Sequence, residues 1–156
     1  MKIQIIAVGQ KMPAWVEQAC ADYLKRMPRE IEVQITVIPP AQRRARDSTE
    51  HYRQLEARQI IKKAGSNGLS IALDEQGKLW SSNDWAQQLD NWMQQQPRVN
   101  LLIGGPDGLA DECREICRQT ISLGRMTMPH ALVRVVLVEQ LYRAWSILKG
   151  HPYHRE

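Results

Sequence analysis

The chain has 156 residues, of which 43% are hydrophobic, and a formal net charge of +4 at pH 7. This length suits one domain over residues 1–156 with a single sizeable core. The apolar run at the N-terminus is too short for a signal peptide, and charged residues interrupt the longest apolar run. A secreted or membrane-spanning protein is therefore excluded, and residence in the cytoplasm is expected. The net positive charge weakly favours a polyanionic partner.

The first half of the chain alternates between strand and helix patterns. Residues 3–8 form a short apolar run that predicts a strand, and a proline then opens a helical pattern over about 13–27. Apolar residues that alternate with polar ones predict a second strand over 33–37. A polar, basic helix with a modest apolar stripe is predicted over 41–63.

The same alternation continues to the end of the chain. The predicted elements are a strand over 69–73, a helix capped by Ser81 and Ser82, a strand over 99–103, and helices over 111–120 and 131–148. This order predicts an α/β fold, an open and mostly parallel sheet with helices on both faces. Ligands of such sheets bind at the carboxyl ends of the strands, where Leu73-Asp74 and Gly104-Gly105 stand.

The sequence LLIGGPDGL at 101–109 is the first motif of interest. An apolar strand that breaks into a glycine-rich turn allows backbone to approach a ligand closely, which predicts a nucleotide-like pocket. The chain has no G-x-G-x-x-G after its first strand, no G-x-x-x-x-G-K-[ST] and no G-x-S-x-G. These absences argue against hydride transfer, nucleoside triphosphate hydrolysis and the simplest hydrolases.

The three cysteines, Cys20, Cys113 and Cys117, cannot all pair within one chain, as is typical of a reducing compartment. Cys113 and Cys117 lie four residues apart, as metal ligands on one helix face can. No second pair of ligands stands at a suitable spacing, so buried thiols are expected and no metal site.

The predicted helix over 131–148 is apolar nearly all round, so it is expected to be buried or to form an interface. Tyr142 and Trp145 are assigned to the core or to a dimer contact. Glu139 and Arg143 have the spacing of an ordinary helix ion pair. His130 follows Pro129 and either caps and packs at the helix start or acts chemically, with equal weight given to both interpretations.

Three stretches together resemble a known family: IGGPDGL at 103–109, MTMPHALVRVVLVEQLYRAWSI at 126–147, and HPYHRE at 151–156. They are similar to the RlmH family, small SPOUT-class methyltransferases of bacterial large-subunit ribosomal RNA, and the length and strand order agree from end to end. The resemblance implies a homodimer with a C-terminal trefoil knot, and S-adenosyl-L-methionine bound within the knot region at about 100–148. It also implies methylation of N3 of a pseudouridine in helix 69 of 23S rRNA, on the assembled 70S ribosome.

The resemblance also assigns site residues by position. Those expected to bind the cofactor are Leu73, Gly104, Gly105, Leu123, Gly124, Arg125, Met126, Thr127 and Met128. Loop N–H and C=O groups can recognise the edge of the adenine, while Leu123 and Met128 flank its ring. The sulfonium methyl group is already reactive, so the protein mainly aligns the reactants and needs no metal.

The acceptor N3 carries a proton near neutral pH, so a base or a polarising group is expected. His130, His154 and Asp74 are the candidate bases. Arg155 can stabilise negative charge on the uracil oxygens, and Tyr153 can stack or hydrogen bond. The resemblance favours the tail at 149–156, reaching into the pocket of the partner subunit, and so assigns catalysis to Tyr153, His154 and Arg155.

Two other functions stay open. The chain can be a noncatalytic ribosome-associated RNA-binding or assembly factor, and a measurement of cofactor affinity would distinguish this from a methyltransferase. It can also be a SPOUT methyltransferase that acts on tRNA, which the lack of an appended RNA-binding domain makes less attractive. A basic cluster, Arg43, Arg44 and Arg46 with Lys62 and Lys63, is either an ordinary solvated face or, with an RNA substrate, a phosphate contact.

Overall fold

Five parallel strands form one sheet in the computed structural model, which describes residues 1–9, 11–44 and 46–154. The strands are β1 (Lys2–Val8), β2 (Glu32–Ile38), β3 (Leu69–Leu79), β4 (Arg98–Ile103) and β5 (Gln119–Ser122). They lie in the order β2-β1-β4-β3-β5, and each pairing between them is parallel. The open parallel sheet predicted from the alternation of elements is confirmed.

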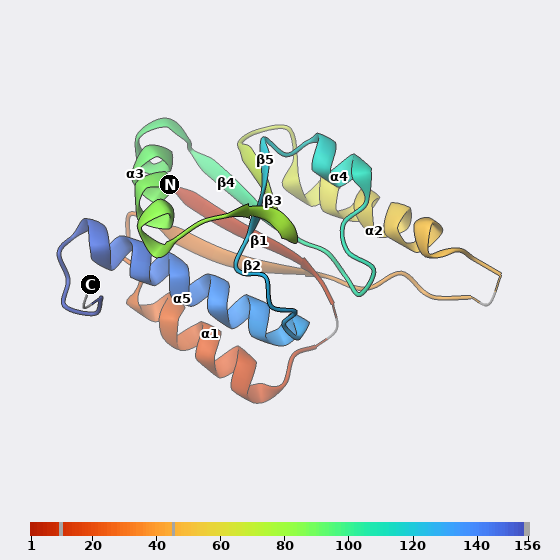
Figure 1. Cartoon of the computed structure of the whole chain (residues 1–156), viewed down its shortest axis with the longest axis horizontal. Helices are drawn as coiled ribbons and strands as arrows, with labels where there is room; N and C mark the ends of the chain where they lie inside the picture. Colours follow the sequence, from red (N-terminus) through yellow and green to blue (C-terminus); the bar gives the residue numbers. More distant parts are fainter. Residues whose placement is uncertain (10, 45, 155–156) are drawn as a thin grey trace.

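Helices cover both faces of the sheet, as predicted (Figure 1). They are α1 (Ala14–Arg26), α2 (Thr49–Ala64), α3 (Ser82–Gln95), α4 (Asp111–Glu115) and α5 (His130–Leu148). Helices α1, α3 and α5 pack on one face, and α2 and α4 pack on the other. Ser81 begins α3 with a capping box in which its side chain and that of Asp84 satisfy each other's backbone N–H groups.

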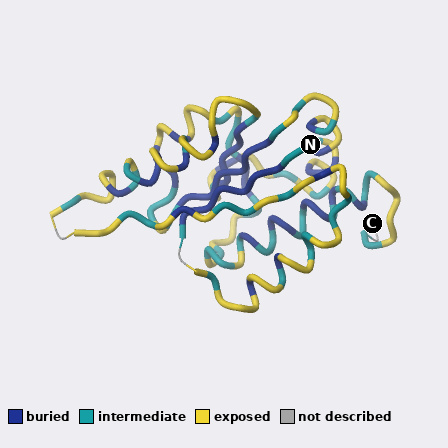
Figure 2. The backbone as a smooth tube through the Cα atoms, turned by 180° about the vertical axis from the view of Figure 1, so that it is seen from behind, coloured by how far each residue is buried: buried dark blue, intermediate teal, exposed yellow. Residues whose placement is uncertain are grey.

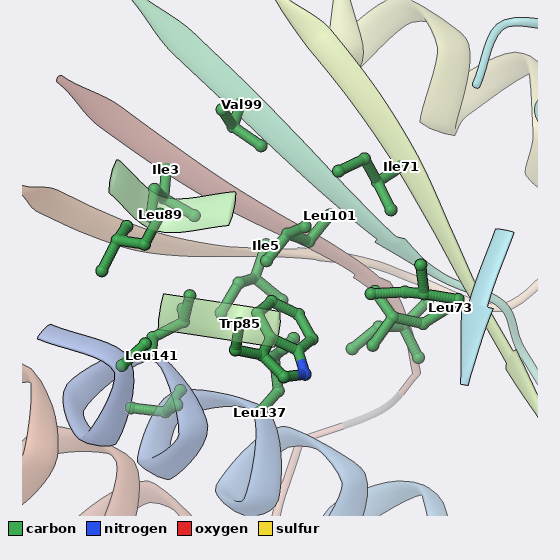
Figure 3. Close-up of a cluster of buried hydrophobic side chains, with 14 of the residues drawn as sticks. Ile3, Ile5, Ile71, Leu73, Trp85, Leu89, Val99, Leu101, Leu137 and Leu141 are labelled. Atoms are coloured by element: carbon green, nitrogen blue, oxygen red, sulfur yellow. The ribbon is translucent and has the colours of Figure 1, made fainter. Parts of the chain in front are cut away.

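The apolar strands divide their side chains between two cores because successive residues of a strand point to opposite faces. Figure 3 shows the larger core, in which Ile3, Ile5 and Leu101 of the sheet meet Trp85 of α3 and Leu137 of α5. The smaller core joins the opposite face of the same strands to α2 and α4. Burial on both faces explains why the central strands are continuous apolar runs, and Figure 2 shows buried residues concentrated there.

Two predicted helices are shorter in the structure. The helix expected over 41–63 begins at Thr49, where Ser48 accepts a hydrogen bond from His51 N at 3.2 Å. The segment before it, shown in orange in Figure 1, projects from the body of the molecule. The helix expected over 111–120 ends at Glu115, and the missed strand β5 follows. That strand has four residues and little apolar pattern of its own. Its pairing with β3 stabilises it as a strand.

The third strand continues beyond the predicted end at residue 73. Leu73 and Lys78 both pair with Ile121 of β5, so residues 74–77 bulge out of the ladder between them. Gly77 allows the bulge to press against β5, because a Cβ there would lie 2.6 Å from the main-chain carbon of Ile121. The bulge redirects the chain at the edge of the sheet where ligands of parallel sheets bind.

The cysteines are free thiols in this fold. Cys20 and Cys113 are buried, and burial raises the pKa of Cys113 to about 12 and that of Cys117 to about 11. Both groups are therefore protonated near neutral pH. The expectation of buried thiols is confirmed for Cys113, whereas Cys117 is only partly buried. Over the described ranges, no three His, Cys, Asp or Glu side chains are grouped to hold a metal ion, and no helix has the length and apolarity to cross a bilayer.

Candidate functional site

A cavity of about 490 Å³ lies at the carboxyl edge of the sheet. Three connections form most of its wall: the bulge of β3, the turn after β4 and the loop after β5, with single residues from α4 and α5. The lining residues are Leu73, Asp74, Glu75, Gln76, Ile103, Gly104, Gly105, Pro106, Gly108, Leu109, Arg114, Leu123, Gly124, Met126, Thr127, Met128 and Val133. Eight of the nine residues that the resemblance assigned to cofactor binding thus surround one space.

Contacts between main-chain atoms within the turn over 104–109 hold its conformation. Gly108 N donates to Gly105 O at 3.0 Å, and Gly108 has a φ of 79°, which a residue with a side chain rarely adopts. A Cβ on Gly104 would lie 2.5 Å from the main-chain carbon of Gly108. The glycine at 104 is therefore required by the turn itself, whereas the sequence had suggested that these glycines serve close approach to a ligand.

An ion pair between the β3 bulge and α4 lies in the cavity wall. Arg114 of α4 donates to Asp74 Oδ2 at 2.7 Å, and the main-chain N–H of Gln76 donates to Asp74 Oδ1 at 2.8 Å. Both carboxylate oxygens of Asp74 are thus engaged. This argues against Asp74 as the base that removes a proton from a substrate.

The loop after β5 closes the cavity from the other side. Ser122 Oγ binds both the N–H and the carbonyl of Gly124, and Thr127 Oγ1 donates to Glu75 Oε2 at 3.2 Å. Arg125 is the one assigned cofactor residue that does not line the cavity, because its guanidinium turns to the main-chain oxygen of Glu75. Its side chain ties the loop to the β3 bulge.

His130 joins the first turn of α5 to the glycine turn. Its Nε2 lies 2.6 Å from the carbonyl oxygen of Gly104, and its Nδ1 is buried with no hydrogen-bond partner in the described part of the chain. Burial lowers the pKa of His130, and so does the charge of Arg134, while the Gly104 contact opposes them. One ring nitrogen is therefore occupied and the other is shielded from solvent, which favours the structural interpretation of His130 over the chemical one.

The described part of the tail, residues 149–154, lies away from the cavity of its own chain. Tyr153 donates to Glu139 Oε1 at 2.9 Å and packs edge-on to Tyr142, while His154 Nδ1 lies 3.2 Å from Ser146 Oγ. Glu139 is nine residues beyond His130, or about 14 Å along a helix axis at the usual rise per residue. Neither Tyr153 nor His154 is among the described residues that line the cavity. Arg155 falls outside the described residues.

The arrangement of sheet and cavity agrees with comparisons against known proteins. Residues 1–154 match the family described as "Predicted SPOUT methyltransferase". The chain belongs to the SPOUT methyltransferase family. Membership of this family makes S-adenosyl-L-methionine its cofactor.

Relatives of this SPOUT chain extend over its whole length. It is 48% identical over 156 residues to "Ribosomal RNA large subunit methyltransferase H" of Hahella chejuensis, with all of both chains covered. It is 45% identical over 155 residues to the protein of the same name from Saccharophagus degradans, covering 99% of this chain and all of that one. A solved methylase family protein from Haemophilus influenzae is similar in fold, with a TM-score of 0.58 and 14% identity over 99% of this chain and 70% of that one.

Several residues that line the cavity are not predicted from the sequence. Arg114 and Val133 reach the cavity from helices, and Gln76 and Pro106 extend the assigned loops. Their neighbours Asp74 and Gly105 had been placed at the strand ends. Extending each strand end by a few residues would have included Gln76 and Pro106, but the two helical residues carry no local signal.

Proposed function

We propose that the chain transfers the methyl group of S-adenosyl-L-methionine to large-subunit ribosomal RNA, at N3 of a pseudouridine in helix 69 of 23S rRNA on the assembled 70S ribosome. The observation that carries the proposal is the convergence of eight assigned cofactor residues on one cavity. The full-length relatives named as large-subunit ribosomal RNA methyltransferases support the choice of substrate.

The cavity suits an adenosine derivative in size and lining. Its volume falls within the range of small-molecule sites, which are mostly apolar with a few fixed polar groups. Leu123 and Met128 offer apolar contacts to an adenine ring, and the main chain of the 104–109 turn offers donors and acceptors. The bound cofactor supplies an electrophilic methyl group, and the surrounding loops hold it in line with the acceptor nitrogen.

The proton on N3 has to leave as the methyl group arrives, and one chain offers few groups for this step. Asp74 is engaged at both oxygens, and His130 presents no free nitrogen to the cavity. His154 lies beside Ser146, away from the cavity. Burial and hydrogen bonds to Tyr23 and Glu139 raise the pKa of Tyr153, so its hydroxyl stays protonated and serves as a donor.

These separations favour an active site shared between two copies of the chain. We infer a homodimer in which the tail at 149–156 of one copy meets the cavity of the other, with His154 and Arg155 near the uracil ring. Large apolar side chains that are exposed at the cavity support such a contact: Met126 of the lining is 79% exposed, and Leu132, next to the lining residue Val133, is 36% exposed. The trefoil knot at about 100–148 belongs to the same proposal.

The projecting segment before α2 is the proposed RNA contact. Arg43 forms an ion pair with Asp107 of the glycine turn and lies 4.9 Å from the centre of the Tyr52 ring, and Arg44 is held through its main chain by the Tyr52 hydroxyl. These contacts therefore hold Arg43 and the main chain of Arg44 beside Asp107 of the glycine turn and Tyr52 of α2. Exposed arginines on a protruding segment suit the phosphates of a folded RNA.

The test is transfer of labelled methyl from S-adenosyl-L-methionine to 70S ribosomes that carry the pseudouridines but lack this methyl group, with the modified nucleotide mapped. Label at N3 in helix 69 is expected. Label on tRNA supplied in parallel, with none on ribosomes, would replace the proposal with tRNA methylation. Absence of both transfer and cofactor binding would favour a noncatalytic ribosome-associated factor.

A further inference from the structure

The contact between His130 and Gly104 fixes the protonation pattern of the imidazole. A carbonyl oxygen only accepts hydrogen bonds, so the hydrogen of the neutral ring is on Nε2, which donates to Gly104 O at 2.6 Å. The lone pair of Nδ1 is then buried, and no described residue donates a hydrogen bond to it. Within the described chain, the ring acts as a hydrogen-bond donor to the cavity turn.

Arg134 lies one helical turn beyond His130, with 3% of its surface exposed. Its Nε and Nη2 are buried and have no hydrogen-bond partner among the residues that the structure describes. Both side chains converge on Gly9 at the end of β1: a Cβ on Gly9 would lie 2.7 Å from Arg134 Nη2 and 3.6 Å from His130 Nδ1. A buried guanidinium therefore stands next to the unprotonated nitrogen of the imidazole.

The surroundings of His130 disfavour a second proton. Cys20 of α1 is the titratable group that interacts with Arg134, and burial raises the pKa of its thiol, so it supplies no negative charge near neutral pH. Arg134 is the charged group that acts on His130 within the described part of the chain. A proton on Nδ1 would place two positive charges together in a buried space, which is costly.

We propose that His130 is a positioning residue that holds the Gly104 carbonyl, and with it the 104–109 turn, in the form that binds the cofactor. The inference rests on the proposed cofactor site. It gives His130 a function in the site although the residue touches neither substrate nor methyl group.

Binding of S-adenosyl-L-methionine to the whole protein, measured by calorimetry, tests the contact. His130→Ala is expected to weaken binding about 3- to 10-fold, the equivalent of one hydrogen bond. His130→Gln is expected to bind nearly as the parent does, because its side-chain amide can donate to the same carbonyl. His51→Gln on α2 is the matched control and is expected to bind like the parent protein. Equal binding by His130→Ala and the parent would overturn the proposal.

Rescue by the conservative variant separates positioning from simple packing. The Nε2 hydrogen is present in both the neutral and the protonated ring, so the contact with Gly104 holds in either state. A loss of binding in His130→Gln as large as that in His130→Ala contradicts the inference, whereas a parent protein that binds no cofactor contradicts the proposed function itself.

Discussion

Arg114 and Asp74 form an ion pair of 2.7 Å that joins α4 to the β3 bulge in the wall of the cavity. The two residues are 40 positions apart in the sequence, and their contact fixes the position of the β3 bulge, one of the three connections that form the site, relative to α4. The side chain of Asp74 is 17% exposed and that of Arg114 is 40% exposed. Such a pair contributes little to global stability and more to local geometry.

Asp74→Asn is therefore expected to weaken binding of S-adenosyl-L-methionine several-fold while changing the free energy of unfolding by no more than about 1 kcal/mol. Calorimetry and urea denaturation measure the two effects. Asp22→Asn provides the control, because Asp22 forms an exposed ion pair with Arg26 on α1. Equal effects of the two substitutions on cofactor binding would show that the Asp74 pair has no part in the site.

Gly104→Ala is expected to destabilise the glycine turn by about 1–3 kcal/mol and to reduce cofactor affinity strongly, because the new Cβ would meet main-chain atoms that cannot move independently. Gly65→Ala is the comparison. Gly65 has a φ of 69° and nothing within 4 Å of its Cβ position, so only about 1 kcal/mol of backbone strain is expected, with normal binding. A Gly104→Ala protein that binds the cofactor like the Gly65→Ala protein would refute the close-packed turn.

Charge reversal on the projecting segment is expected to weaken RNA binding. Arg44→Glu with Arg46→Glu should lower affinity for a helix 69 hairpin and reduce the steepness of its salt dependence by about one unit for each phosphate that the protein no longer neutralises. Lys25→Glu with Arg29→Glu, at exposed positions in α1 and between α1 and β2, controls for the change in net charge. If the slope of affinity against salt stays the same after reversal on the projecting segment, these arginines form a solvated face only.

Arg155→Ala is expected to abolish methylation and to leave cofactor binding intact, as measured by methyl transfer and calorimetry on the same protein. Unchanged turnover in this variant would eliminate the tail from the mechanism.

Mixed dimers test whether the tail acts on the other copy. Met128→Glu places a charge in the cavity lining and is expected to prevent cofactor binding. Neither variant should be active alone, but co-expressed Arg155→Ala and Met128→Glu chains should recover part of the activity, since one site of the mixed dimer combines an intact cavity with an intact tail. No recovery would place the tail and the cavity in the same copy.

The sequence determined the elements whose signal is local. The strand at 99–103 and the glycine turn after it were predicted where they occur, because apolar runs and glycine punctuation depend on neighbouring residues alone. Burial on both faces follows from the same runs. The sequence failed over the described residues of 41–48 and over 116–122, where the structure depends on partners outside each stretch. The Tyr52 hydroxyl holds the main chain of Arg44, and β3 pairs with residues 119–122.

Only the tertiary structure decided what the candidate residues do. In the structure, Asp74 forms an ion pair, Arg125 turns away from the cavity, and His130 contacts the Gly104 carbonyl. Tyr153 and His154 lie beside the middle and the end of α5. Each of these outcomes depends on a contact between segments that no periodicity relates. Local sequence patterns predict the elements and the candidate residues, and the tertiary fold determines which of their atoms are in contact.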